Sequence, residues 1–399
     1  SSDLNGVLFT PTSQVNVGGL VATTLNLSTD NFMAGNYKFE GASSNAIINQ
    51  GNITASGDNG KGGTIALIAA KITNDGSLNA NAGNVLLGAG SAVTLDLGGP
   101  VKLQVTQGAI DALINQGGAI KADGGLVYLT AKAAGDLAST VINHTGITEA
   151  QTLATGEKGQ IYLMGDMAHG QINVGGKLDA SAPYGGDGGF VETSAAKVAF
   201  ANDVKVTTAA ANGKTGTWLI DPTDFTIANS GGDMTATQLS TNLGSSSVTI
   251  QSANGAAGTN GDIFVNDNIT WSSGNTLTLS AYHNININAT IDASGGSGGV
   301  VKLYYAQGGG AGDYNFGLSS TGFAGKINLH AGSNFYTKEG SGGNDTAWTV
   351  ITRLGTDTDA TTTPSSNSLQ GLAYDNFSTG GIYGNLSGKF VLGADIDAS

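Results

Sequence analysis

The 399-residue sequence has no cysteine, 5 prolines and only 12% charged residues. Without cysteine it forms no disulfide, no thiolate metal site and no cysteine nucleophile, which suits a chain exported through an oxidising compartment. The charged fraction is about half the usual share, which disfavours a solvated disordered segment and leaves Asn, Thr, Ser, Gln and Gly to form the polar surface. No apolar run is long enough to span a bilayer as a helix.

Arginine is equally scarce, since Arg353 is the only one, and 30 acidic residues against 16 basic ones give a net charge of −14. Proteins that bind nucleic acid neutralise its phosphates with clusters of arginine and lysine. The sequence has no such clusters, so nucleic acid is excluded as a partner. We interpret the acidity as a source of solubility.

Glycine is abundant, with 64 residues, and the sequence contains a repeat. Residues 172–193 combine a short alternating apolar run, a corner that ends in Asp179-Ala180-Ser181, a glycine-rich turn and a second apolar run. The pattern returns at residues 285–303 and 47–67, and degenerate relatives begin at Ile72, Ile114 and Ile142. The period-two alternation predicts strands, and the glycine doublets between them predict turns that need positive φ.

The copies recur roughly 20 to 30 residues apart, which is the interval expected for one circuit of a solenoid. A hairpin meander would instead need two-residue Asn-Gly or Asp-Gly turns between strands of similar length. We therefore predict an all-β parallel β-helix whose coils stack on one another, with loops and short extra strands as excursions. Asparagines at equivalent positions are predicted to hydrogen-bond along the stack: Asn49, Asn74, Asn115, Asn143 and Asn173.

A change of texture divides the chain into residues 1–215, which carry the repeat, a junction at 216–235, and a continuing β-helix at 236–399 with irregular excursions near 308–380. In the junction, Asp221 and Asp224 flank Pro222. Two carboxylates this close could serve acid–base chemistry or cation binding. We favour a turn in which an aspartate caps backbone amides. Residues 234–243 predict a short helix that interrupts the coils.

Several segments carry a family resemblance: Asn5-Gly6 before a strand, residues 15–24 (VNVGGLVATT), the INxG coils and residues 216–228 (GTWLIDPTDFTIA). Together they resemble the exoproteins of two-partner secretion systems, the filamentous-haemagglutinin-like adhesins of Gram-negative bacteria. The resemblance implies that residues 1–215 correspond to the C-terminal part of a secretion domain, itself a right-handed β-helix that an outer-membrane barrel transporter recognises. We expect the chain to be a fragment that covers most of this domain and the coils that follow it.

The resemblance also supplies candidates for the secretion motif. The family typically has Asn-Pro-Asn-Gly before this stretch, and residues 3–6 (DLNG) keep the last two positions. The secretion-motif candidates are Asn5, Gly6, Asn16, Gly18 and Gly19.

The absent cysteine, the low charge, the stacked coils and the resemblance favour a secreted or cell-surface adhesin rod that mediates attachment, biofilm matrix contact or cell–cell adhesion. Its expected partners are the outer-membrane transporter and an exopolysaccharide or a host or bacterial surface glycan. Aromatic side chains near glycine loops can stack on sugar rings. The glycan-binding candidates are Tyr304, Tyr305, Tyr314 and Trp348. The alternative is that these aromatic side chains fill the core or cap a coil end.

Two other functions remain open: a polysaccharide-active enzyme, because pectin-degrading enzymes share the β-helix, and a module that binds a specific host protein or another ligand. Such enzymes need clustered acids or a basic groove, whereas the acids here are dispersed. The histidines share no motif, and we expect them to be surface or turn residues: His144, His169, His283 and His330. Asp187 lies in a single GGDGG loop, whereas calcium loops of this kind occur in tandem. We therefore expect no enzyme activity, no cofactor and no metal.

Overall fold

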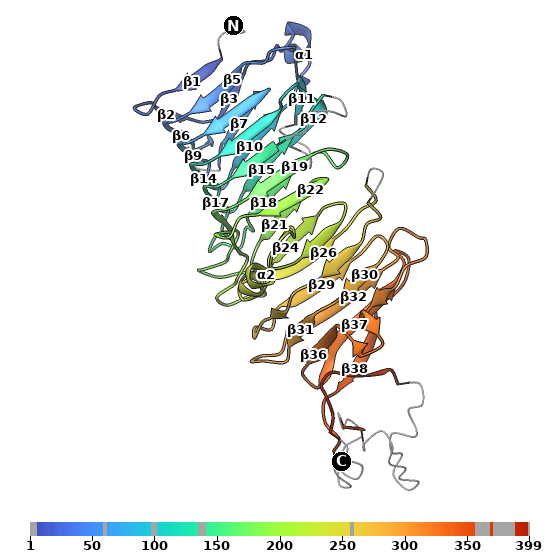
Figure 1. Ribbon diagram of the computed structural model, residues 1–399. Coiled ribbons are helices and arrows are strands. Elements are labelled where there is room, and N and C mark those ends of the chain that lie inside the picture. Colours follow the sequence, from blue (N-terminus) through green and yellow to red (C-terminus); the bar gives the residue numbers. More distant parts are fainter. Residues whose placement is uncertain are drawn as a thin grey trace. The chain divides into compact units, whose positions relative to one another are not determined.

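The computed structural model describes residues 6–58, 62–96, 102–134, 141–255, 259–355, 368–369 and 388–397. Contacts within the chain define two compact units. The first comprises Ser1–Asp224 with Ser245–Ser247 and Gly255–Thr259, and the second comprises Phe225–Gly244, Val248–Asn254 and Asn260–Ser399. In each unit, strands from successive turns of the chain lie side by side in long parallel sheets (Figure 1). The predicted all-β parallel β-helix is confirmed, while the partition at residues 215 and 235 stays a prediction.

In the first unit, each coil contributes one strand to each of three sheets, and within these three sheets the described strands of this unit pair with one another only in parallel. The first sheet has the order β1 (Val7–Phe9), β5 (Ala46–Asn49), β8 (Lys71–Asn74), β13 (Leu113–Gln116), β16 (Val141–His144), β19 (Gln171–Val174), β22 (Lys197–Phe200). The second has the order β2 (Gln14–Val17), β6 (Asn52–Ala55), β9 (Ser77–Asn79), β14 (Ala119–Lys121), β17 (Ile147–Glu149), β20 (Lys177–Asp179), β23 (Lys205–Thr207). Within this unit the third has the order β3 (Leu20–Thr23), β7 (Thr64–Ala69), β10 (Asn84–Ala89), β15 (Leu126–Ala131), β18 (Gln160–Met164), β21 (Phe190–Ser194), β24 (Thr217–Asp221).

The core of the first unit consists of columns of inward-facing side chains that run from coil to coil. In the first sheet the repeat positions stack in register and are fully buried: Ile47, Ile72, Ile114, Ile142, Ile172 and Val198. The third sheet contributes a similar column: Ile65, Val85, Val127, Ile161, Val191 and Trp218. Burying one such side chain contributes about 1.5–3 kcal/mol. A residue gains this stabilisation only when the next coil covers its side chain.

Glycine columns mark two corners of the first unit. A Cβ at Gly83, Gly125, Gly189 or Gly216 would collide with the carbonyl oxygen of the glycine one coil earlier. A second column obeys the same rule: Gly76, Gly118, Gly146 and Gly176. Most of the predicted doublets therefore hold glycine because neighbouring coils approach closely. Positive φ is required at only some doublet positions, among them Gly62 and Gly124, so turn geometry alone was an incomplete explanation.

A second layer covers part of the first unit. β4 (Tyr37–Glu40), β11 (Ala92–Leu95) and β12 (Leu103–Gln107) form a three-stranded antiparallel sheet, and α1 (Thr29–Met33) precedes it. Their apolar side chains pack with those of β7 and β10 in one cluster: Leu25, Phe39, Ala66, Ile68, Leu86, Val93, Leu95 and Leu103. Both faces of β7 and β10 are buried as a result, which explains their continuous apolar sequences. The predicted extra-strand excursions are confirmed by this sheet.

The second unit starts with the same coil plan in shorter sheets. One sheet has the order β25 (Phe225–Ile227), β27 (Ile263–Val265), β30 (Ile285–Ile287), β33 (Tyr314–Asn315), and another has the order β28 (Ile269–Thr270), β31 (Thr290–Ala293), β36 (Lys326–Leu329). The third, within this unit, has the order β26 (Ser247–Gln251), β29 (Thr276–Ser280), β32 (Val300–Tyr305), β37 (Gly332–Glu339), β38 (Thr346–Ile351), β39 (Phe390–Leu392).

Departures from the coil plan accumulate along the second unit. The short helix expected at residues 234–243 is α2 (Ala236–Leu243), whose N-terminus carries a capping box formed by Thr235 and Gln238. β37 and β38 pair antiparallel, and β34 (Leu318–Ser319) and β35 (Gly322–Phe323) form a small antiparallel hairpin. These excursions place side chains outside the repeating core, where they are available for contacts with other molecules.

Candidate functional site

The secretion-motif candidates that the structure describes lie on the first coil of the first unit, and Asn5 lies outside the described residues. Gly6 precedes β1 with φ of 88°, and a Cβ there would collide with the carbonyl oxygen of Ala46. Asn16 lies on β2 with an exposed side chain. The carbonyl of Gly18 accepts the N–H of Gly57 at 2.9 Å. Among these candidates, Asn16 offers the side chain best placed to meet a partner.

The first coil also presents exposed apolar side chains. Among the described residues, β1, β2 and β3 pair with β5, β6 and β7. Leu8 is 58% exposed and Val21 is 44% exposed. The coil that holds Asn16, Gly18 and Gly19 therefore exposes both polar and apolar side chains.

The asparagines form two ladders, which corrects the prediction of a single one. The buried ladder lies inside the coils: Asn49 Nδ2 donates to Asn74 Oδ1, and Asn74 Nδ2 donates to Gln116 Oε1, both at 2.7 Å. The second ladder is half-buried and faces outward, with Asn173 donating to Asn143 at 2.8 Å and Asn143 to Asn115 at 2.9 Å. Both ladders hold coils in register rather than exposing amides for chemistry.

His144 occupies the coil position that follows Gln116 in the buried ladder. The ring is fully buried, with Nδ1 2.8 Å from the carbonyl oxygen of Gly175 and Nε2 2.9 Å from Oγ1 of Thr148. These contacts suit a neutral ring that donates from Nδ1 and accepts at Nε2, and burial lowers the pKa of His144. The expectation of a surface or turn residue is wrong for this histidine, because the ring replaces an amide of the ladder.

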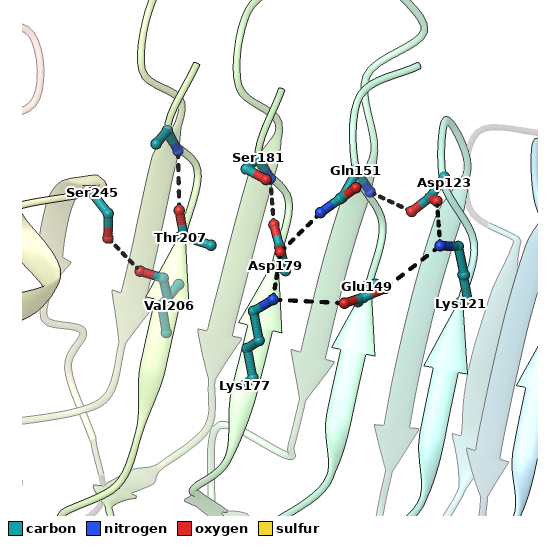
Figure 2. A network of polar contacts seen from close by, with 11 residues as sticks. Lys121, Asp123, Glu149, Gln151, Lys177, Asp179, Ser181, Val206, Thr207 and Ser245 are labelled. Atoms are coloured by element: carbon teal, nitrogen blue, oxygen red, sulfur yellow. Dashed lines mark hydrogen bonds and ion pairs between the residues drawn. The ribbon is translucent and has the colours of Figure 1, made fainter. Parts of the chain in front are cut away.

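Charged side chains connect three successive coils at the end of β14, β17 and β20 (Figure 2). Asp179 is buried and accepts from Lys177 Nζ at 2.8 Å, from the N–H of Ser181 at 2.9 Å and from Gln151 Nε2 at 3.0 Å. The N–H of Gln151 in turn donates to Asp123 at 2.9 Å. Burial acts to raise the pKa of Asp179, but the hydrogen bonds from Lys177, Ser181 and Gln151 outweigh it and hold that pKa below its ordinary value.

The network in Figure 2 supports a structural role for the repeated Asp-Ala-Ser corner. In the second unit, Asp292 likewise accepts the N–H of Ser294, two residues on, at 3.0 Å. Asn328 of the next coil also donates to Asp292, at 3.3 Å, as Gln151 does to Asp179. Each aspartate therefore closes its own turn and accepts a hydrogen bond from an adjacent coil. Such fully used carboxylates have little capacity left for acid–base chemistry.

The four glycan-binding candidates do not form one surface. Tyr304 points outward from β32, where its hydroxyl donates to Asp345 at 2.7 Å and Lys338 Nζ lies 4.4 Å from its ring centroid. Trp348 lies opposite Phe335 on β38 and donates through Nε1 to Thr337 at 2.9 Å. Because Phe335 and Thr337 alternate with the outward Tyr336 and Lys338 along β37, Trp348 faces the other side of the sheet from Tyr304.

Tyr305 and Tyr314 lie together, with ring centroids 5.3 Å apart. Tyr314 also lines an open groove of about 400 Å³ in the second unit. Along its wall, Tyr314 and Phe316 pack edge to face at 5.9 Å, and Phe316 and Phe323 at 6.3 Å. Of the four candidates, Tyr314 alone lines this groove.

Apolar side chains form the floor of the groove and polar ones its rim. The floor includes Ile327, Leu329 and Phe335, and Lys326 Nζ lies 3.1 Å from Oδ2 of Asp395 at the rim. Sequence reasoning did not find Phe323, Lys326 or Asp395 as site residues. In the sequence, the glycine directly before Phe323 is a signal of a turn that carries an aromatic side chain. The structure confirms the turn, since Gly322 has a φ of 117°.

The remaining chemical candidates are Asp221, Asp224 and the other histidines. Thr223 fixes the turn between Asp221 and Asp224, because its N–H and hydroxyl both donate to the carbonyl of Ala196, at 3.3 and 3.0 Å. His283 Nδ1 lies 2.9 Å from Asp262. Across the part of the chain that the structure describes, no three His, Asp or Glu side chains gather as metal ligands would, and no helix has the length and apolar character to cross a membrane.

Comparisons with known proteins agree with this geometry. Residues 4–180 match the family model of the TPS secretion domain. The chain is similar to the solved structure of the HMW1 secretion domain from Haemophilus influenzae, with a TM-score of 0.50 and 19% identity over 85% of this chain and 78% of that one. This likeness shows a shared fold. No curated protein matches the sequence.

Proposed function

Because residues 4–180 are the TPS secretion domain of a secreted two-partner secretion exoprotein, we propose that an outer-membrane barrel partner exports the chain and that the chain then acts as a surface adhesin. The attachment would be to an exopolysaccharide or to a glycan of a host or bacterial surface, as in a biofilm matrix. In this proposal the first unit provides the export signal and the second unit provides the contact.

Export through a narrow channel requires an unfolded chain, and the first unit is built to fold afterwards. Each of its coils buries its core against the preceding coil, so folding can add one coil at a time as the chain emerges. The first coil, with the exposed Asn16 on β2, is the proposed contact for the transporter.

The observation that carries the adhesive role is the aromatic groove of the second unit. Phe323 is 69% exposed on its hairpin and Leu392 is 60% exposed beside the groove. Exposed apolar groups gathered at one place indicate a binding surface. The dispersed, hydrogen-bonded acids of both units support adhesion without catalysis over the polysaccharide-active enzyme.

Export can be tested by producing the chain with its transporter and measuring the amount released into the medium. Asn16→Ala and Gly18→Ala are expected to reduce release, since neither change meets a steric obstacle in the coil: Asn16 is exposed and a Cβ at Gly18 has nothing within 4 Å. The matched control is Asn52→Ala, an exposed asparagine on the adjoining strand β6. Wild-type release of both test variants would contradict recognition through the first coil.

Adhesion can be tested with beads coated with the purified chain and applied to surfaces that carry bacterial exopolysaccharide or host glycoproteins. Beads that stay attached under flow, at least several times more often than uncoated beads, support the proposal. Release of new reducing ends from the polysaccharide would instead favour the enzyme. If beads are retained on none of these surfaces, the adhesive role is contradicted.

A further inference from the structure

The aromatic groove has a polar neighbour in the second unit. A second hollow of about 420 Å³ shares part of its wall with the groove: Lys326, Asn328, Leu329, Ala394 and Asp395. Its other lining residues include Ser294, His330 and Thr352. Rings therefore line the groove, hydroxyl and imidazole groups line the second hollow, and the amide of Asn328 lies on the wall that they share.

This two-sided lining fits a ligand with alternating apolar and polar faces. A pyranose ring presents C–H groups that pack on aromatic rings, while its hydroxyls need hydrogen-bond donors and acceptors at the edges. Tyr314, Phe316 and Phe323 provide the rings in the groove, and Ser294 and Thr352 provide hydroxyls in the second hollow. A chain of several sugars could occupy both hollows at once, whereas a single sugar would occupy one.

The charges at the two hollows favour a neutral ligand. Lys326 and Asp395 lie on the shared wall and form an ion pair with each other at 3.1 Å, so their charges cancel locally. The chain as a whole carries a net charge of −14, which repels a polyanion approaching from solution. A uronate or sulfated polymer would therefore lack an uncompensated cation in the groove.

We propose that the two hollows form one extended binding groove for a neutral polysaccharide chain, with one sugar stacked on the Phe316–Phe323 wall and its neighbours bonded by the Asn328 and Thr352 side. The inference rests on the proposed adhesive function and names the ligand class and the residues that would hold it. Phe323 is the key contact, because its ring packs edge to face with Phe316 and is otherwise exposed on the β34–β35 hairpin.

The test is isothermal titration of the purified chain with neutral oligosaccharides from a glucan, a mannan and chitin, and with alginate and heparin as anionic probes. Phe323→Ala is expected to weaken binding of the recognised neutral oligosaccharide about tenfold, the effect of losing one good stacking contact. Phe323→Trp, which keeps an aromatic ring, should bind the oligosaccharide about as well as the wild type. Thr352→Val, which keeps the side-chain shape but removes the hydroxyl, should weaken binding. Phe32→Ala, which removes a ring that is 58% exposed in the first unit, should leave binding unchanged.

Several results would overturn the inference while leaving the adhesive function intact. The first is bead adhesion together with neutral-sugar affinities that Phe323→Ala and Thr352→Val do not alter. The second is stronger binding of alginate or heparin than of the neutral probes. A third is that Phe323→Ala abolishes dimerisation of the chain, or its binding of peptides, while the affinity for sugars stays unchanged. If beads fail to adhere and no oligosaccharide binds, the inference and the proposed function both fail.

Discussion

In the first unit the three strands of each coil repeat those of the coil before it, and the extra strands β4, β11 and β12 form a separate layer that packs on β7 and β10, whereas in the second unit a helix, a hairpin and an antiparallel strand pair interrupt the coils. The first unit uses its small residues for contact between coils, as the glycine columns show. The second unit directs aromatic side chains into a groove outside the repeating core. A regular solenoid leaves few side chains free to form a concave surface, so departures from the repeat are needed to build one.

The largest difference between the units is expected for glycine substitutions. Gly125→Ala would place a Cβ against the carbonyl oxygen of Gly83, and the separation of the coils should reduce the free energy of unfolding by about 3 kcal/mol or more. Gly310→Ala in the second unit has nothing within 4 Å of the new Cβ and should be nearly neutral. Denaturant unfolding of both variants measures the contrast, and equal stabilities would refute the close-approach explanation.

The next effect concerns the buried amide ladder. Asn74→Ala would leave Asn49 Nδ2 and Gln116 Oε1 without their 2.7 Å partners inside the coils, which should cost about 2 kcal/mol. In the second unit, Asn288→Ala removes an exposed bond to Asn266 of 2.8 Å, and the loss should stay within about 0.5 kcal/mol. Thermal or denaturant unfolding separates the two, and similar losses would mean that the ladder does not depend on burial.

The single asparagine ladder failed as a prediction because the repeat allows two alignments. The letters Ile-Asn recur at Ile48-Asn49 and at Ile114-Asn115, but the structure pairs Ile114 with Ile72, and Ile72 with Ile47 instead of Ile48. This shift of one residue sends Asn49 inward and Asn115 outward. The hydrophobic core sets the register, so the same Ile-Asn motif can direct its asparagine inward in one coil and outward in another.

Other features were predictable to different degrees. The coil interval and period-two alternation identified the β-helix, because both are local properties of the sequence. The groove as a whole was not predictable, since Phe323 comes from a hairpin and Asp395 follows β39, about 70 residues away in the sequence. The glycine columns were also hidden, because the atoms that exclude a Cβ belong to a different coil.

A pH dependence is expected in the first unit. The pKa of the buried His144 is lowered, so the folded state favours the neutral ring, and the unfolded chain takes up a proton first as pH falls. The unit should therefore lose stability below the ordinary histidine pKa of about 6.5. Unfolding measured from pH 7.5 to 5 should show this slope, and His144→Gln, which places an amide next to Gln116 in the stack, should flatten it. The same slope in wild type and variant would assign the effect to other groups.

The smallest expected difference is that between ion pairs of the two units. Lys177 lies 2.8 Å from the buried Asp179 and 3.6 Å from Glu149, yet its side chain is 40% exposed, so Lys177→Gln should cost only about 0.5 kcal/mol. Lys326→Gln in the second unit removes a pair with Asp395, whose side chain is 91% exposed, and should cost less still. Because salt screens exposed charges more than buried ones, raising the ionic strength should reduce the effect of Lys326→Gln before that of Lys177→Gln. A larger loss for Lys326→Gln in chemical unfolding would show that the rim of the groove contributes to folding as well as to binding.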